Sequence, residues 1–366
     1  MKTILVFALA LRVCLAQGGI INTIAGSGVE GFLGDGGPAS AARLGLPTAV
    51  VADRAGNVYI ADEFNNRVRK VAPDGTISTF AGTGILGFSG DGGSADKAKL
   101  YLPNDLALDS AGNLYIADQG NDAIRKVNPS GVISTVAGAQ VGIIPNGTSR
   151  LNAADSVALD AAGNIYTAGA NFILKVDTSG AVTLFAGGVL GFSGDGGPAK
   201  SAAVRSPTGI VVDPSGNLYF SDTGNNRIRK IDKNGIITTV AGIGTAGFLG
   251  DGGPATQAQI KLAGAPMAGL ALDSAGNLYV ADWGNNRIRM INTAGVITTV
   301  AGGGGIQVQR DNPWGDGKLA TMANLLQPRG VFVDSVGNLY IADTGHSQVR
   351  KVTAGSGVVT PTPPSI

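Results

Sequence analysis

Short apolar runs alternate with polar turns along almost the whole chain, and the same order of runs recurs six times. The clearest copy, GNVYIADEFNNRVRKV, begins at Gly56 and alternates apolar with polar residues. Related segments, one of them degenerate (GNIYTAGANFILKV), begin at Gly112, Gly163, Gly216, Gly276 and Gly337. A fixed repeat built on a period of two residues predicts short β-strands and a repeat architecture.

Each repeat contains four predicted strands. In the first repeat these are strand a (AVVAD, 49–53), strand b (NVYIAD, 57–62), strand c (RVRKV, 67–71) and strand d (TISTFAG, 76–82). The D-x-x-G-N sequence between a and b places glycine where a tight turn needs a positive φ. Six four-stranded units predict an all-β fold, a six-bladed β-propeller.

The ends of the chain fit a closed ring. INTIAG, at 21–26, is a d strand with no a, b or c before it, and the last repeat ends at Val352 without a good d strand. We therefore expect the N-terminal strand to complete the last blade and to cover two exposed edges. GVVT, at 357–360, is a weaker alternative. The expected propeller spans 17–354 and is followed by a Pro/Thr-rich tail, 355–366.

The repeated residues resemble the NHL repeat family, whose pattern is P-x-G-I-A-x-D, then G-N-[IVL]-Y-V-A-D, then N-N-R-I. The resemblance covers about Ile20 to Val352, and the GFSGDGGPA spacer is similar to that of secreted bacterial members. It implies a six-bladed propeller. It does not imply one function, because members of the family include protein-binding modules, RNA-binding modules and a metal-dependent lyase.

The first sixteen residues, MKTILVFALALRVCLA, have the pattern of a secretory signal peptide cut after Ala16. This predicts a secreted, periplasmic or cell-envelope protein, and no other segment is apolar enough to span a membrane. Cys14 is the only cysteine and would leave with the signal. Loss of Lys2 and Arg12 turns the net charge from +1 to −1, which argues against a broad nucleic-acid surface.

The glycine-rich stretch GFLGDGGPA, at 31–39, combines glycines with an aspartate, as loops that bind phosphate or a metal ion do. Three G-x-G-x-x-G matches, at Gly26, Gly82 and Gly242, lack the long helix that a dinucleotide site needs. The GDGG core offers one carboxylate, whereas calcium loops offer several oxygen ligands. We therefore expect Asp35 and its equivalents to accept backbone N–H bonds within the turn.

Residues repeated in every copy are expected to serve the repeat. Six tyrosines share one position of strand b and are expected to pack between blades. The aspartates that end strand b, such as Asp62, are expected to pair with Arg67, Arg227 and Arg287 or to bond loop backbone. The single histidine, His346, excludes a zinc site with three histidines.

Departures from the repeat are better candidates for a ligand site. At the start of strand a, near the mouth of the central channel, the copies carry Asn104 with Asp105, Asp155 with Ser156, and Arg329. The family pattern has glycine where Asp105 and Ser156 stand. Asn104, Asp105 and Asp155 supply oxygens suited to calcium or another divalent ion. The ligand set is incomplete, so no metal or other cofactor is assigned.

The intact architecture without a recognisable catalytic set favours a binding scaffold over an enzyme. The alternative is a metal-dependent lactonase, hydrolase or lyase at the channel mouth, and a third possibility is a structural envelope module joined to another domain through the tail. For the scaffold we expect a monomer that binds a protein or carbohydrate on the face carrying the b–c and d–a loops. Phe64, Trp283 and Trp314 are the predicted contact residues.

Overall fold

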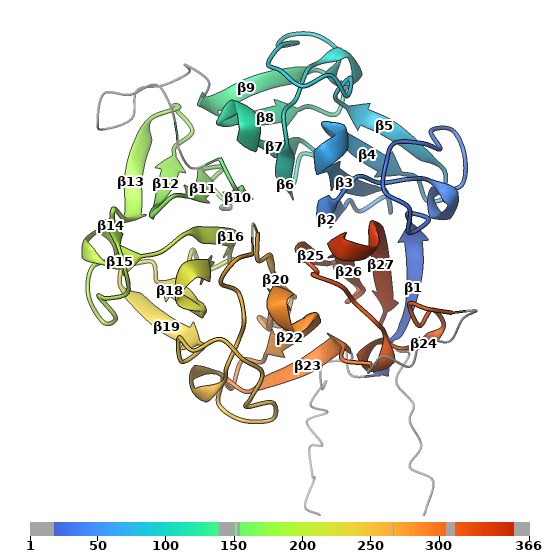
Figure 1. The fold of residues 1–366 in the computed structure, drawn as a ribbon. Helices are drawn as coiled ribbons and strands as arrows, with labels where there is room; N and C mark the ends of the chain where they lie inside the picture. Colours follow the sequence, from blue (N-terminus) through green and yellow to red (C-terminus); the bar gives the residue numbers. More distant parts are fainter. Residues whose placement is uncertain (1–17, 139–150, 152–153, 266, 305–311, 355–366) are drawn as a thin grey trace, which may run out of the picture.

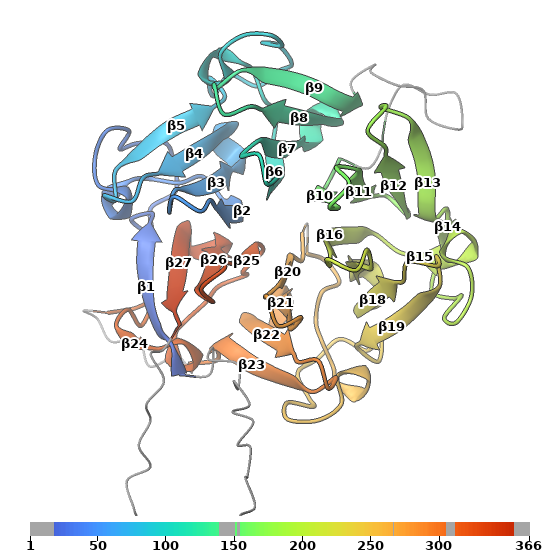
Figure 2. The same ribbon diagram turned by 180° about the vertical axis from the view of Figure 1, so that it is seen from behind.

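Six antiparallel sheets form a closed ring around a central axis (Figures 1 and 2). The computed structural model describes residues 18–138, 151, 154–265, 267–304 and 312–354. In that part of the chain there is no α-helix, only strands and three-residue 3-10 turns. The predicted all-β six-bladed propeller is confirmed. The predicted signal peptide and the Pro/Thr-rich tail lie outside the described residues.

Strands a and b form the inner half of each blade. Strand a lines the central axis, in the order β2 (Pro47–Ala52), β6 (Pro103–Leu108), β10 (Ala158–Leu159), β16 (Pro207–Val212), β20 (Leu270–Leu272) and β25 (Val331–Val333). Strand b follows as β3 (Val58–Asp62), β7 (Leu114–Asp118), β11 (Ile165–Gly169), β17 (Leu218–Asp222), β21 (Leu278–Asp282) and β26 (Leu339–Asp343).

Strands c and d form the outer half, and the d strands run along the rim (Figure 1). Strand c is β4 (Arg67–Val71), β8 (Ala123–Val127), β12 (Phe172–Val176), β18 (Arg227–Ile231), β22 (Arg287–Ile291) and β27 (Gln348–Thr353). Strand d is β5 (Ile77–Ala81), β9 (Ile133–Gly138), β13 (Val182–Gly187), β19 (Ile237–Ala241), β23 (Ile297–Gly302) and, for blade six, β1 (Ile20–Ala25).

The first strand of the chain closes the ring. β1 pairs with β27 from Ile20 opposite Thr353 to Ala25 opposite Val349. A short strand, β24 (Lys318–Leu319), adds to the outer edge of β1, so blade six has five strands. The predicted closure by the N-terminal strand is confirmed, and the alternative segment GVVT lies outside the described residues.

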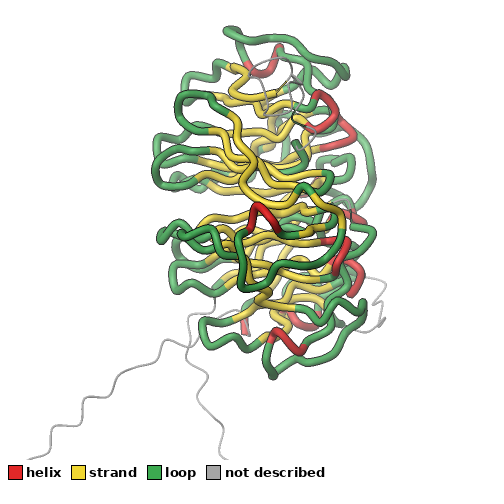
Figure 3. Tube along the Cα trace, turned by 90° about the vertical axis from the view of Figure 1, so that its left-hand side faces the viewer, coloured by secondary structure: helices red, strands yellow, loops and turns green. Residues whose placement is uncertain are grey.

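Two sets of 3-10 turns lie between the strands (Figure 3). One set forms the b–c loops, as η3 (Glu63–Asn65), η5 (Gln119–Asn121), η7 (Thr223–Asn225), η9 (Trp283–Asn285) and η11 (Thr344–His346). The other lies in the d–a loops, as η2 (Ala39–Ala41), η4 (Ala95–Lys97), η6 (Ala199–Ser201), η8 (Ala255–Gln257) and η10 (Ala320–Met322). A small parallel pair, β14 (Val189–Leu190) with β15 (Ala203–Val204), braces one d–a loop.

The repeated tyrosines pack between neighbouring blades, as predicted. Tyr59 belongs to one apolar cluster with Leu106 and Ile116 of the next blade. Its ring meets Phe80 edge-on, with 4.9 Å between the ring centroids. The Tyr59 hydroxyl donates to the carboxylate of Asp53, the residue that follows strand a. Burial is the main cause, and the negative charge of Asp53 the second, of a pKa that is raised to about 12 for Tyr59.

Candidate functional site

A buried arginine on strand c organises most blades. Arg69 is fully buried, and its guanidinium contacts two carboxylates, Asp62 at 3.2 Å and Asp35 at 2.6 Å. Asp62 ends strand b, and Asp35 belongs to the GDGG segment of the d–a loop. Four other blades repeat the arrangement with Arg125, Arg229, Arg289 and Arg350. In these five blades the Asp–Arg–Asp network therefore holds the d–a loop against the outer half of the blade.

The structure corrects the prediction about Asp35. For Asp62 and Arg67 it shows the second of the two predicted alternatives, bonds to loop backbone, because Asp62 accepts from the Gly45 N–H and Arg67 donates to carbonyls. Asp35 accepts hydrogen bonds from the side chains of Arg69 and Thr79 rather than from backbone N–H groups of its own turn. Arg67, at the first position of β4, donates to backbone carbonyls, including that of Thr83, and stacks on Phe32 at 3.8 Å from the ring centroid. The arginine two residues further along reaches both carboxylates because it lies deeper between the strand and the loop.

Blade three lacks the whole network. Gly169 stands in place of the aspartate that ends strand b, Leu174 stands in place of the arginine, and its d–a loop carries no GDGG. A buried charge is strongly destabilising without its partner, so the charged members are lost together. The unusual sequence of this blade has a structural explanation in that loss, although its d–a loop (139–150) lies outside the described residues.

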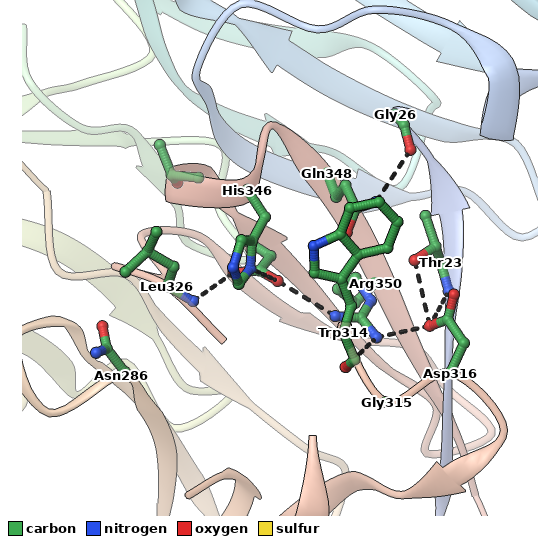
Figure 4. A network of polar contacts seen from close by, with 12 residues as sticks. Thr23, Gly26, Asn286, Trp314, Gly315, Asp316, Leu326, His346, Gln348 and Arg350 are labelled. Atoms are coloured by element: carbon green, nitrogen blue, oxygen red, sulfur yellow. Dashed lines mark hydrogen bonds and ion pairs between the residues drawn. The ribbon is translucent and has the colours of Figure 1, made fainter. Parts of the chain in front are cut away.

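In blade six the same network joins the two ends of the propeller (Figure 4). Arg350 contacts Asp316 at 2.6 Å and Asp343 at 3.3 Å. The Asp316 carboxylate also accepts a bond from the backbone N–H of Thr23, on β1. His346, where the other intact blades have asparagine, lies 2.9 Å from Asp343 through Nδ1. The charged network thus holds the closing strand in place.

The central channel contains a cavity of about 200 Å³. Its lining comes from strand a of every blade and is mainly aliphatic, with Val50, Leu106, Ile210 and Leu270 among the side chains. Of the described residues that line it, only Asp105 is ionisable. The described side chains around the channel are therefore without charge at every level except that of Asp105.

The polar departures at the start of strand a form bonds between neighbouring blades. Asn104 donates through Nδ2 to the Asp155 carbonyl at 2.6 Å, and Ser156 donates through Oγ to the Thr208 carbonyl at 3.1 Å. In blades with glycine at the second position the backbones approach too closely for a side chain. A Cβ on Gly209 would lie 2.3 Å from a neighbouring carbonyl oxygen. On the two sides of blade three, the side-chain hydrogen bonds of Asn104 and Ser156 link the neighbouring blades instead of a close contact between their backbones.

Asp105 bridges blades two and three through its carboxylate. Oδ2 accepts from the backbone N–H of Val157 at 3.0 Å, and Oδ1 accepts from Leu106 at 2.9 Å. Burial raises the pKa of Asp105 to about 7, although both backbone bonds act to lower it. The carboxyl group therefore changes charge near neutral pH.

Raising the pH from about 5 to about 8 is expected to remove stability that Asp105 provides. Its folded-state pKa lies above the ordinary value of 3.8, so the folded chain holds a proton that the unfolded chain has released. The stabilisation is complete below about pH 4 and is lost as the pH rises through about 7. The free energy of unfolding of the wild type, relative to that of Asp105→Gly, is expected to fall by roughly 1 kcal/mol per pH unit in between.

Urea titrations of both proteins at several pH values measure this difference. Asp105→Gly is the matched variant because glycine occupies this position in three other blades. The two proteins share every other buried carboxyl, so the difference isolates Asp105. A difference that stays constant with pH would contradict the assignment.

Asp155 and Arg329 are held by separate partners. Asp155 Oδ1 accepts from the Gln119 amide at 2.7 Å, and burial raises its pKa. Arg329 pairs with Glu63 of the adjacent blade at 2.9 Å. Asn104 thus bonds the backbone of Asp155, whereas the carboxylates of Asp105 and Asp155 have separate partners. No cluster of three metal-binding side chains occurs within the described residues. The ligand-binding role of the five mouth residues stays a prediction.

The three predicted contact residues differ in exposure. Phe64 is 54% exposed on the b–c loop of blade one. Trp283 and Trp314 are half-buried, with Trp283 against the apolar cluster of blade five and Trp314 beside Gly28 and His346. Phe64 is therefore the most accessible of the three.

Comparisons with known families agree with the repeat pattern. The teneurin NHL domain matches residues 87–146 and 191–248, and the NHL repeat matches residues 268–289. The chain therefore contains NHL repeats, and its six-bladed propeller is consistent with the NHL repeat family. Mouse teneurin-1 is 30% identical over 238 residues, which is 56% of this NHL-repeat propeller and 9% of the teneurin. The Arabidopsis thaliana protein SUPPRESSOR OF QUENCHING 1, chloroplastic, is 28% identical over 302 residues, covering 74% of the propeller chain and 27% of the plant protein.

The propeller spans about a tenth of the length of the teneurins and shares its fold with bacterial proteins. A protein of unknown function from Bacteroides thetaiotaomicron aligns with a TM-score of 0.65 at 19% identity, over 91% of this chain and 75% of that one. An auxiliary nutrient binding protein from the same organism aligns with a TM-score of 0.63 at 17% identity, over 91% and 76%. No helix of the described residues is long and apolar enough to cross a membrane.

Proposed function

We propose that this NHL-repeat propeller is a non-catalytic binding scaffold that holds a protein partner on its d–a and b–c loops. We also propose that the chain is exported, because residues 1–16 have the pattern of a signal peptide. The scaffold role is supported by the exposed apolar side chains of the d–a loops.

Four of the six d–a loops expose large apolar side chains at corresponding positions. Four copies of the repeat have phenylalanine at the same position of this loop. These are Phe32, Phe88, Phe192 and Phe248, and each is 37% to 43% exposed. Their neighbours are more exposed still: Leu86 is 60%, Leu190 is 63% and Leu249 is 64%. Contiguous exposed apolar groups are typical of protein interaction sites. The d–a loops that carry them are distributed around the ring (Figure 1), which supports a partner that spans several blades.

The stacking of each phenylalanine favours a protein partner over a carbohydrate. The guanidinium of Arg227 covers one face of Phe192, at 4.0 Å from the ring centroid, and Arg287 covers Phe248 at 4.1 Å. Because an arginine covers one face of each ring, the surface left for a partner is mostly that of the leucines. Apolar side chains of a protein complement such an aliphatic surface better than a carbohydrate does. The arginines also fix the orientation of the loops before any partner binds, which lowers the entropic cost of binding.

The test compares three versions of the propeller as immobilised bait. A triple variant, Leu86→Lys, Leu190→Lys and Leu249→Lys, is expected to lose a partner that the wild type retains. Val336→Lys is the matched control, because Val336 is 73% exposed but lies on an a–b turn. A purified candidate should bind the wild type and the control saturably and the triple variant at least about tenfold more weakly. Equal binding to all three would contradict the assigned surface.

A second measurement tests the absence of catalysis. Turnover across a panel of lactones and esters, lost on Asp105→Ala but kept in the triple loop variant, would overturn the scaffold proposal in favour of a hydrolase.

A further inference from the structure

Blade five carries an insertion just before strand a. In blades one, two, four and six, the aspartate that ends strand b accepts a bond from a backbone N–H located 17 residues earlier. In blade five the same bond joins Asp282 to Lys261, 21 residues earlier. Four extra residues therefore lie between Lys261 and β20. Figures 1 and 2 show this part of the chain running toward the middle of the ring.

The insertion delivers Met267 into the channel. Met267 is 3% exposed and lines the central cavity. It packs in the apolar cluster formed by blades one and two, together with Ala49, Val51 and Leu106. β20 lies across the ring from β6 (Figure 1). Met267 therefore reaches from blade five to the a strands of blades one and two, and it forms part of the cavity wall.

The channel places one carboxyl group among apolar side chains. Asp105 is the first residue of β6 that lines the cavity, and the lining continues through Leu106 and Ala107 to Leu108. Its two oxygens accept one backbone N–H each, whereas a carboxylate can accept about four hydrogen bonds. In the part of the chain that the structure describes, no basic side chain forms an ion pair with Asp105. A cation on a bound molecule would offset the cost of holding this charge away from water.

We propose that the cavity of the central channel is a binding site for a small organic monoamine, with the ammonium on Asp105 and an apolar body against the aliphatic walls. A cavity of about 200 Å³ suits a body the size of one ring. A divalent metal is a poorer fit, because calcium takes six to eight oxygens and the lining supplies one carboxylate.

Calorimetric titration at about pH 8 tests the proposal with benzylamine and with benzyl alcohol, its neutral analogue. We expect benzylamine to bind with one molecule per chain and at least about tenfold more tightly than benzyl alcohol, because of the charge-assisted bond. Asp105→Asn is expected to lose this preference. Ala107→Phe, which imitates Phe332 at the equivalent position of blade six, fills the cavity and is expected to lose both ligands while keeping the carboxylate.

Each of the remaining outcomes contradicts the proposal. These are no binding of benzylamine to the wild type, equal affinity for the alcohol, or unchanged affinity in both variants. Calcium that binds the wild type and displaces benzylamine would identify a metal site instead. Because the loop-face variants of the scaffold test leave the channel untouched, failure of either proposal is distinguishable from failure of the other.

Discussion

Removal of residues 20–25 is expected to abolish the cooperative unfolding of the propeller. β1 is the outer strand of blade six, and Ile21 and Ala25 are fully buried in the clusters on its two sides. Truncation of the Ile21 side chain alone leaves a cavity and lowers the free energy of unfolding by about 2–5 kcal/mol. The whole strand contributes much more, and the total free energy of unfolding of a protein is about 5–15 kcal/mol. Its loss also leaves β27 as an unpaired edge, which promotes aggregation.

Strand complementation makes this prediction specific. A synthetic peptide of residues 18–27 is expected to restore the thermal transition of the truncated chain when added in excess. The same peptide with Ile21→Asp is the matched control, because it brings a charge to a fully buried position and should fail. Melting temperature and light scattering follow the two reactions. A truncated chain that unfolds like the wild type without peptide would show that β1 does not close the ring.

The strand order of the fold was predictable from the chain because each signal was repeated. The alternation in GNVYIAD and RVRKV appears six times, with a glycine turn after every strand a. One degenerate copy, such as the one that contains Ile165–Gly169, therefore does not obscure the pattern. The single d strand at 21–26 predicted closure because the last repeat was the one repeat without a good d strand of its own. Pairing of β24 outside β1 was not predictable, since two residues without alternation carry no pattern.

The ion-pair alternative of the sequence prediction named Arg67, whereas the pair with Asp62 is formed by Arg69. The R-x-R segment places Arg67 and Arg69 on one face of β4, and the pattern alone does not say which of them reaches the GDGG aspartate. The absence of Asp, Arg and GDGG together from blade three was the stronger signal. Three losses in one repeat imply that the three groups touch in the others, and the structure shows that contact.

The channel was less predictable than the strands. Asp105 stood out as a departure from glycine, but its burial depends on the spacing of two blades, which no local pattern encodes. Met267 carried a signal only in length, as four extra residues before strand a of blade five. A change in loop length predicts that something differs at that place, and packing across the ring decides what the added residues reach.

Arg350→Leu is expected to destabilise the propeller by about 3–5 kcal/mol, because it leaves a buried carboxylate without its cation. Asp343 is fully buried beside Arg350, and Asp316 links the same arginine to Thr23 of the closing strand. Leucine is the informative replacement, since Leu174 occupies this position in blade three. Arg54→Leu, at an exposed turn position, is the control and is expected to change stability by at most about 0.5 kcal/mol.

A double-mutant cycle separates the charge effect from a loss of packing. Asp343→Asn is expected to be destabilising in the wild type, where it weakens the pair with Arg350, and to recover about 1–2 kcal/mol in the Arg350→Leu background, where it neutralises the orphaned charge. Urea unfolding of the four proteins gives the coupling free energy. If Asp343→Asn costs the same in both backgrounds, the arginine contributes through its volume alone. A buried ion pair predicts that the effect of Asp343→Asn on stability changes sign between the two backgrounds. The same coupling is a physical reason for blade three to lack both the acids and the arginine.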